Sequence, residues 1–201
     1  MQSVGNKLVV YGIFGMLLIG LIIPSISNGE ADALIGQKAP ELSGEPAVGG
    51  GLLKVSKMSR ELEFVKDAQG KFIEKDGEYV MRITRNIIVL NFFATYCVPC
   101  IKEIPAFNRL YQKYRDKAVK LLYVNVDPEM DQAKVQRFIV EKHMEPPMML
   151  PNQQQTMKAY GVESLPRIVI IDRDGNIAEV ITGFQADLEQ QLSDVIEKLS
   201  L

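Results

Sequence analysis

Two cysteines, Cys97 and Cys100, are the residues best suited to chemistry, and they stand in the order Cys-Val-Pro-Cys. They follow an apolar run, Ile87 to Phe93, that is typical of a buried central strand, and Val98 to Lys117 then shows helical periodicity. Unpaired N–H groups and the positive dipole at a helix start favour a thiolate, so we expect Cys97 to be the nucleophile. Cys100 lies one turn inside the helix, where its sulfur can attack a mixed disulfide formed at Cys97. Pro99 stiffens this first turn.

Two other interpretations of the cysteine pair remain open. Half of a structural zinc site would need two more ligands, and only His143 is available beyond carboxylates. A purely structural disulfide would close a very short loop, which constrains the unfolded chain little. The chain has no other cysteine that could mispair with these two, which favours redox chemistry.

The composition excludes several classes of protein. The chain has 201 residues, of which 47% are hydrophobic and 24% charged, which is ordinary for a globular protein. A net charge of −2 gives no basic footprint, so we expect no nucleic acid partner. The single histidine argues against a histidine-based metal site or a Ser-His-Asp site. Thiol-disulfide exchange needs no bound cofactor, and we expect neither a cofactor nor a metal.

The N-terminus predicts export. Leu8 to Pro24 is apolar and uncharged, with Lys7 as the only basic residue before it. This length lies between that of a signal-peptide core and a short membrane-spanning helix, so residues 1–27 are either a cleaved signal or a retained anchor. Small residues permit cleavage after Ser27 or Ala33. The segment has no amphipathic face, which argues against a buried core helix. Whether the segment is cleaved or retained, the remaining chain is expected outside the cytoplasm.

The remaining sequence divides into three parts. Residues 28–51 read as a linker and lead-in, and the Gly- and Pro-rich stretch Ser43 to Gly51 is predicted to be a loop. Residues 52–85 read as an N-terminal β extension, in which Asp76-Gly77 predicts a two-residue hairpin turn. We expect a local hairpin packed on the edge of the main sheet. Residues 86–201 form the main domain.

The main domain predicts an α/β fold with element order β-α-β-α-(β)-α-β-β-α. Strand–helix–strand crossovers imply a parallel core, and a hairpin near the end adds antiparallel strands. After the first strand and helix, the expected elements are a strand at Val119–Val126, a helix capped by Asp127-Pro128 and ending near His143, a strand at Met148–Leu150, a helix from Asn152 to Gly161, strands at Arg167–Asp172 and Asn176–Thr182, and a helix over Leu188–Leu199.

Three stretches carry a resemblance to a known family: IIVLNFFATYCVPCIKEIPAFNRLYQKY, VNVD, and YGVESLPRIVIIDRDGNI with Gly183 after it. The sequence resembles the thioredoxin superfamily, and within it the exported TlpA/ResA type of thiol-disulfide oxidoreductase, which includes cytochrome c maturation thioredoxins. The opening IGQKAPEL matches the segment before the fold in this group. The resemblance implies a thioredoxin-like three-layer α/β/α sandwich with a mixed central sheet. An N-terminal hydrophobic helix and an extra N-terminal β-hairpin would be added to it.

The resemblance also implies roles for single residues. Cys97 would be the nucleophile and Cys100 the resolving thiol. Pro166 matches a proline that takes the cis form beside the cysteines, and Leu165 before it would present its backbone to an extended substrate. Pro99 and the residue before the first cysteine would complete the substrate-binding surface.

Other positions differ from, or add to, the family pattern. Tyr96 stands where a tryptophan is usual, which keeps an aromatic platform of another shape. Asn91 occupies the place of a buried aspartate in cytoplasmic thioredoxins. Glu103 matches an acidic residue that tunes thiol protonation, and we expect a partly buried carboxylate there to raise thiol pKa values when ionised. The alternative for Glu103 is an ordinary solvated helix residue. Pro105 matches a proline that kinks the active-site helix.

The expected function is reduction of disulfides in exported proteins, with apocytochrome c as one plausible client. Electrons would come from a membrane thiol transporter of the CcdA/DsbD kind, and the location would be the periplasm or the outer face of the bacterial inner membrane. A copper-handling or membrane-tethered binding protein of the same fold is the alternative. Its Cys-x-x-x-Cys spacing is one residue longer than here, and His143 reads as a helix-end surface residue.

Two further features argue against neighbouring functions. Direct peroxide reduction requires Pro-x-x-x-Thr-x-x-Cys, where this chain has Leu90 and Ala94. The methionines Met144, Met148 and Met149 read as core residues rather than soft-metal ligands.

Overall fold

The computed structural model describes residues 32–128 and 131–201, and Asp32–Leu201 forms one compact unit. The predicted signal or anchor segment lies outside these residues. None of the helices described is both long and apolar enough to cross a membrane. The elements are β1 (Ser43–Pro46), β2 (Leu53–Lys54), α1 (Val55–Ser59), β3 (Arg60–Phe64), β4 (Glu74–Lys75), β5 (Glu78–Tyr79), β6 (Met81–Arg85), β7 (Ile87–Phe93), α2 (Val98–Tyr114), β8 (Val119–Asn125), α3 (Gln132–Glu141), β9 (Met148–Pro151), α4 (Gln153–Ala159), β10 (Arg167–Ile171), β11 (Ile177–Thr182) and α5 (Leu188–Ser200).

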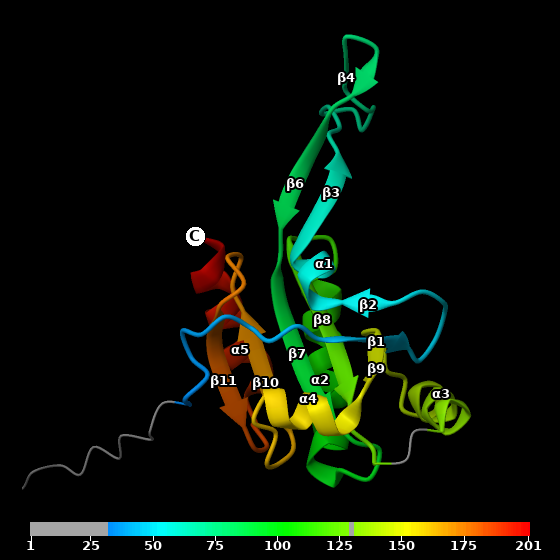
Figure 1. Cartoon of the computed structure of the whole chain (residues 1–201), viewed down its shortest axis with the longest axis vertical. Coiled ribbons are helices and arrows are strands. Elements are labelled where there is room, and N and C mark those ends of the chain that lie inside the picture. Colours follow the sequence, from blue (N-terminus) through cyan, green and yellow to red (C-terminus); the bar gives the residue numbers. More distant parts are fainter. Residues whose placement is uncertain (1–31, 129–130) are drawn as a thin grey trace, which may run out of the picture. The chain divides into compact units, whose positions relative to one another are not determined.

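A seven-stranded mixed sheet organises the unit, with strand order β11-β10-β7-β8-β9-β1-β2 (Figure 1). β7, β8 and β9 are parallel. On one side β10 pairs antiparallel with β7 and β11 antiparallel with β10, and on the other side β1 pairs antiparallel with β9. Every residue of β7 is buried, as its continuous apolar sequence predicts. The predicted order of strands and helices from Ile87 onward is confirmed.

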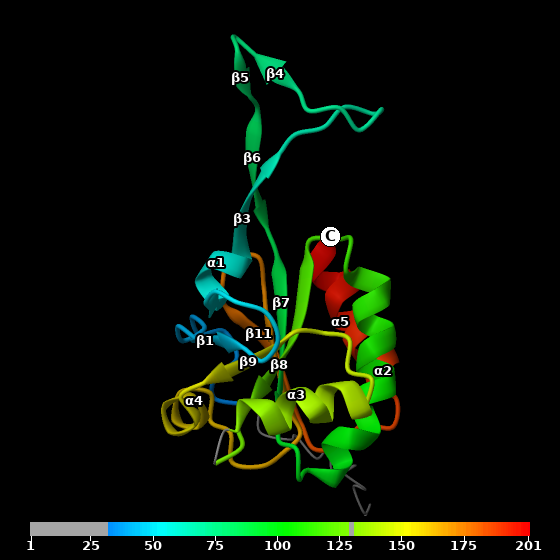
Figure 2. The same ribbon diagram turned by 90° about the vertical axis from the view of Figure 1, so that its right-hand side faces the viewer.

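Helices cover both faces of the sheet. Adjacent residues of β7 face opposite layers: the Phe92 ring lies 5.2 Å from that of Tyr160 at the end of α4, and the Phe93 ring lies 5.5 Å from that of Tyr123. The Tyr123 ring contacts Phe107 of α2 at 4.8 Å, so α2 covers the second face. α5 lies beside α2 (Figure 2). This is the expected three-layer α/β/α arrangement.

The predicted loop at Ser43 to Gly51 is wrong for its first four residues. These form β1, whose residues Gly44 and Glu45 pair with Pro151 and Leu150 of β9. Glycine is required at position 44 because β1 and β9 approach closely there, not because the chain turns. A Cβ at Gly44 would lie 2.6 Å from the Leu150 carbonyl oxygen.

A long hairpin, residues 60–85, projects from the unit, and we refer to it as the arm. β3 and β6 pair with each other in a separate two-stranded sheet, and β4 and β5 continue it to a turn at Asp76-Gly77. Both turn residues have positive φ, 56° and 82°, as the predicted two-residue hairpin requires. The expectation that this hairpin packs on the sheet edge is wrong. Figures 1 and 2 show the arm extending away from the main sheet, and its side chains are largely exposed.

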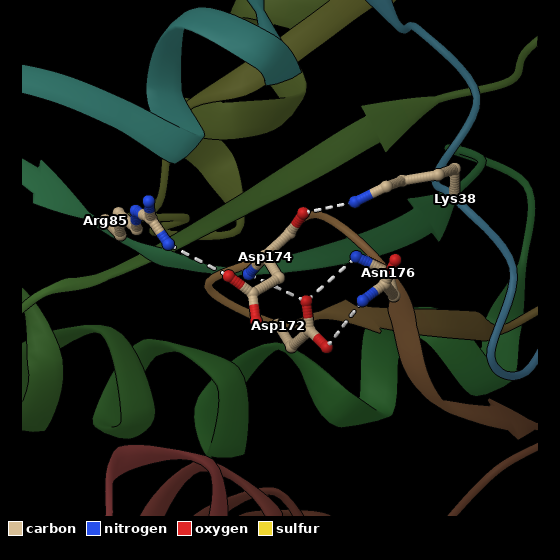
Figure 3. Close-up of polar contacts among 5 residues, drawn as sticks. All are labelled: Lys38, Arg85, Asp172, Asp174 and Asn176. Atoms are coloured by element: carbon tan, nitrogen blue, oxygen red, sulfur yellow. Dashed lines mark hydrogen bonds and ion pairs between the residues drawn. The ribbon is translucent and has the colours of Figure 1, made fainter.

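Polar contacts fix the base of the arm (Figure 3). Arg85 Nη1 lies 3.0 Å from Asp174 Oδ1 in the β10–β11 turn, and Lys38 Nζ donates to the Asp174 carbonyl oxygen at 2.6 Å. The turn itself is closed by Asp172, whose Oδ1 accepts from the backbone N–H groups of Asp174 and Asn176. The arm is therefore tied to the end of the sheet at which β7 begins.

The loop that leads to the cysteines is held by Asp127, which corrects another prediction. Asp127 does not cap α3, because its carboxylate accepts from Thr95 N and Thr95 Oγ1, both at 2.9 Å, and from Asn125 Nδ2 at 3.0 Å. α3 begins later, with Asp131 as its N-cap residue accepting from Ala133 N.

We predict that Asp127→Ala lowers the free energy of unfolding by about 2–4 kcal/mol, because it leaves the buried Asn125 amide and the half-buried N–H and hydroxyl of Thr95 without an acceptor. Thr95→Val should cost about 1–2 kcal/mol, and the exposed cap variant Asp131→Ala about 1 kcal/mol. Urea denaturation of the oxidised protein measures all three. Equal losses for Asp127→Ala and Asp131→Ala would contradict the assigned role of Asp127.

Candidate active site

The two cysteines lie where β7 passes into α2. Cys97 is the N-cap residue of α2, and its Sγ accepts from the backbone N–H of Cys100 at 3.2 Å. The two residues form a disulfide, with their Cα atoms 5.3 Å apart. Pro99 occupies the first turn, as expected. A sulfur at this position receives an N–H donor and the helix dipole, and both stabilise a thiolate on Cys97.

The two sulfur-bearing residues differ from their neighbours in exposure. Cys97 and Cys100 are 7% and 2% exposed, whereas Tyr96 and Val98 beside them are 66% and 61% exposed. The buried pair is therefore flanked in the chain by two exposed apolar side chains. The aromatic platform predicted for Tyr96 is available to solvent.

The loop before β10 carries the predicted cis peptide, Leu165-Pro166, and this prediction is confirmed. β10 pairs antiparallel with β7, and Arg167 lies opposite Phe92. The loop with the cis peptide is thus at the same end of the sheet as the loop leading to Cys97. The Pro166 carbonyl oxygen accepts from Gly183 N at 2.8 Å. Neither backbone group of Leu165 has a hydrogen bond among the described residues.

Glu103 lies one turn after Cys100 in α2, and its side chain is buried rather than solvated. Its Oε1 accepts from Gln185 N at 2.9 Å, while Oε2 has no hydrogen-bond partner among the residues described. Burial raises the pKa of Glu103 to about 7, and the bond from Gln185 only partly opposes this rise. The interpretation of Glu103 as an ordinary surface residue is therefore wrong. The carboxyl group can gain or lose a proton near neutral pH.

Two further polar side chains are buried on the same face of the sheet. Asn91 of β7 and Tyr123 of β8 are register partners, and neither Asn91 Oδ1 nor the Tyr123 hydroxyl has a partner within the described ranges. Burial, reinforced by the Glu103 carboxylate, raises the pKa of Tyr123 well above its ordinary value. Tyr123 thus keeps its proton, and the amide of Asn91 does not titrate. Of these three buried side chains, Glu103 is the one that ionises near neutrality.

Two contributions to the site were missed from the sequence. Gln185 holds Glu103 through a backbone N–H, which no side-chain pattern reveals. Asp127 supports the cysteine loop, and its place directly after a strand parallel to β7 could have indicated this.

The residues set aside in the sequence keep structural roles. His143 is exposed just beyond the end of α3, and Met144, Met148 and Met149 are buried, as predicted. Ala94 and Leu90 are fully buried and carry no hydroxyl group that could assist peroxide chemistry. Across residues 32–128 and 131–201, no group of three or more His, Cys, Asp or Glu side chains is arranged to hold a metal ion.

Known proteins share this architecture. Residues 35–180 match the AhpC/TSA family. The thiol-disulfide oxidoreductase ResA of Bacillus thuringiensis (strain Al Hakam) is 36% identical over 137 residues, which cover 68% of this chain and 73% of that protein. A thiol:disulfide interchange protein from Bacteroides sp. has the same fold, with a TM-score of 0.61 at 16% identity over 81% of this chain and 90% of that one. StoA from Bacillus subtilis gives a TM-score of 0.50 at 26% identity, and the match covers 67% of this chain and 96% of StoA.

The fold, the cysteine pair at the start of α2 and these similarities agree. The chain belongs to the AhpC/TSA family and, within it, to the thioredoxin-fold thiol-disulfide oxidoreductases of the ResA type.

Proposed function

We propose that this protein is an extracytoplasmic reductase that uses Cys97 as nucleophile, Cys100 as resolving thiol and Glu103 as the acceptor of the Cys100 proton. The single observation that carries this proposal is the order of three groups along α2. A cysteine is at the N-cap, a second cysteine lies one turn inside the helix, and a buried carboxyl group lies one turn further. Each group occupies the position that its step needs.

The first step forms a mixed disulfide. The Cys97 thiolate attacks one sulfur of a substrate disulfide, a new S–S bond forms, and the other substrate sulfur leaves as a thiolate that takes a proton from solvent. The N–H of Cys100 and the helix start favour the attacking thiolate. The open backbone of Leu165 supports binding of an extended substrate segment, and Tyr96 and Val98 supply apolar contact beside it.

The second step releases the product. Cys100 gives its proton to ionised Glu103 and attacks the sulfur of Cys97, which breaks the mixed disulfide. The second substrate sulfur leaves as a thiolate and takes a proton from solvent. Two electrons have then passed to the substrate, and the chain holds the Cys97–Cys100 disulfide. A proton acceptor with a pKa of about 7 suits this step near neutral pH. A thiol donor must restore the dithiol.

The cellular setting is part of the proposal. The apolar segment Leu8 to Pro24 supports export, as a cleaved signal or as a membrane anchor. Outside the cytoplasm, we infer that a membrane thiol transporter of the CcdA/DsbD kind is the electron donor. Disulfide-containing exported proteins would be the substrates. Apocytochrome c, with its paired thiols, would be one such client.

We predict that Cys97→Ser abolishes reduction of insulin disulfides in the presence of dithiothreitol, because the attacking sulfur is lost. Cys100→Ser should instead accumulate mixed disulfides with a peptide disulfide, because attack continues without resolution. Mass spectrometry of the adducts under non-reducing conditions separates the two outcomes. Insulin reduction by Cys97→Ser, or adducts carried by Cys100 in that variant, would reverse the assignment of roles.

We predict that Glu103→Gln removes a pH dependence of stability. A carboxyl whose pKa rises from 4.5 in the unfolded chain to about 7 in the fold favours the folded state fully below pH 4.5, and this contribution is lost as the pH rises to about 7. The free energy of unfolding of the oxidised parent should therefore fall across this interval more steeply than that of Glu103→Gln. Urea denaturation at a series of pH values measures both slopes.

The same variant should lower the pKa of the Cys100 thiol, because a buried negative charge one turn away disfavours its thiolate. Alkylation rates of the reduced protein as a function of pH give this value. The matched control is Glu163→Gln, which removes an exposed carboxylate two residues before Leu165. Equal thiol pKa values in the parent and Glu103→Gln would exclude Glu103 as the tuning group.

A further inference from the structure

The arm presents an unpartnered apolar face. In the two-stranded sheet, Leu62 pairs with Ile83 and Phe64 pairs with Met81, so these four side chains lie on one face. They are between 51% and 69% exposed. A soluble unit rarely leaves such a run of large apolar side chains uncovered unless the face contacts a partner.

The far half of the arm is stiffened by three aromatic rings. Phe64, Phe72 and Tyr79 form an edge-to-face cluster with ring centroids 5.6, 5.9 and 6.0 Å apart. The backbone of Val65 bonds to both Val80 and Ile73 beneath this cluster. A preorganised projection loses little conformational freedom when it binds.

The two ends of the arm carry opposite charge. The tip holds Glu74, Asp76 and Glu78 with a single basic residue, Lys75, and these side chains are exposed and form no ion pair with any described residue. The root borders a groove of about 580 Å³. Its exposed cations, likewise without ion pairs in the described structure, are Lys54, Lys57 and Arg60, and its apolar lining includes Leu52, Met58 and Leu62.

The acidic residues of the groove are already engaged. Glu61 Oε2 lies 2.7 Å from Lys120 Nζ and accepts from Asn86 Nδ2. Glu63 Oε2 accepts from Thr84 Oγ1 at 2.7 Å and lies 3.3 Å from Arg82 Nη2. The electrostatic potential of the groove is therefore positive, which complements the negative charge of the tip.

We propose that the arm is a dimerisation element whose partner is the arm of a second copy of this chain. Two arms pack antiparallel, apolar face against apolar face, and the acidic tip of each copy enters the basic groove of the other. A basic root, an apolar middle and an acidic tip are self-complementary only when the two arms run antiparallel. The alignment is that of a two-fold interface.

The charge of the arm separates this partner from a lipid surface. Residues 60–85 contain six basic and six acidic side chains, with the acidic excess at the tip. Anionic headgroups would repel such a tip, and surface-binding segments are instead rich in lysine and arginine.

The dimer leaves the cysteines free. The arm joins β7 at Ile87, whereas Cys97 follows its other end, and seven strand residues separate the two by about 20 Å. Dimerisation and thiol-disulfide exchange are thus independent properties, and either can fail without the other.

Sedimentation equilibrium of the full chain in density-matched detergent tests the proposal. The parent should sediment as a dimer. A tip variant, Glu74→Lys with Glu78→Lys, and a groove variant, Lys54→Glu with Lys57→Glu, should each raise the dimer dissociation constant at least about tenfold, because like charges then meet. An equimolar mixture of the two variants should dimerise again, since each reversed end meets a complementary end. Leu62→Ser with Ile83→Ser should also weaken the dimer.

The control is Lys158→Glu with Lys198→Glu, which makes the same charge change as the groove variant on exposed faces of α4 and α5 and should leave the dimer intact. Insulin reduction by every variant checks that it is folded. A monomeric parent would overturn the proposal, whether or not it binds anionic vesicles through the arm. Unchanged dimerisation of the tip and groove variants, or no recovery in their mixture, would overturn it equally.

Discussion

The burial of one carboxyl group behind a cysteine pair is the constraint around which this site is organised. Glu103 lies inside the fold with a single hydrogen bond from Gln185, so its charged form is penalised. The nearby alternatives for holding a proton are excluded by type, because Asn91 is an amide and Tyr123 keeps its proton. The chemistry proposed for Cys100 depends on this one titrating group. If the carboxylate on this turn of α2 were exposed to solvent instead of buried, the resolving thiol would have no proton acceptor beside it.

The surrounding fold supplies geometry rather than reactive groups. Asp127 holds the loop before Cys97 from the end of β8, and the start of α2 fixes the orientation of that cysteine. The antiparallel pairing of β7 with β10 brings Pro166 to the same end of the sheet. Three elements distant in sequence thus meet there because their strands are neighbours. The opposite end of β7 carries the arm, so chemistry and the proposed association occupy different ends of one strand.

Much of this could be predicted from the sequence, and the failures have physical reasons. The continuous apolar run of β7 and the cysteine spacing lead directly to the buried strand and the capped helix. The cis form of Pro166 followed from resemblance, since no local pattern encodes it. Glycine at Gly44 suggested a loop, because composition cannot distinguish a turn from a strand that needs close approach. Asp127 before Pro128 suggested a helix cap, because the competing donors on Thr95 are 32 residues away. The placement of the arm depends on the surface that its apolar face contacts. The alternating sequence pattern predicts the strands but not this surface.

The reduction potential of the Cys97–Cys100 pair measures how strongly the site favours the disulfide over the dithiol. Equilibration with dithiothreitol or glutathione buffers at pH 7 and pH 8, read by alkylation, gives the value. A buried carboxylate that disfavours the Cys100 thiolate favours the disulfide over the dithiol. We therefore predict a reducing pair, near or below the value of about −270 mV typical of thioredoxin. A value near −120 mV, typical of strong oxidants, would contradict it.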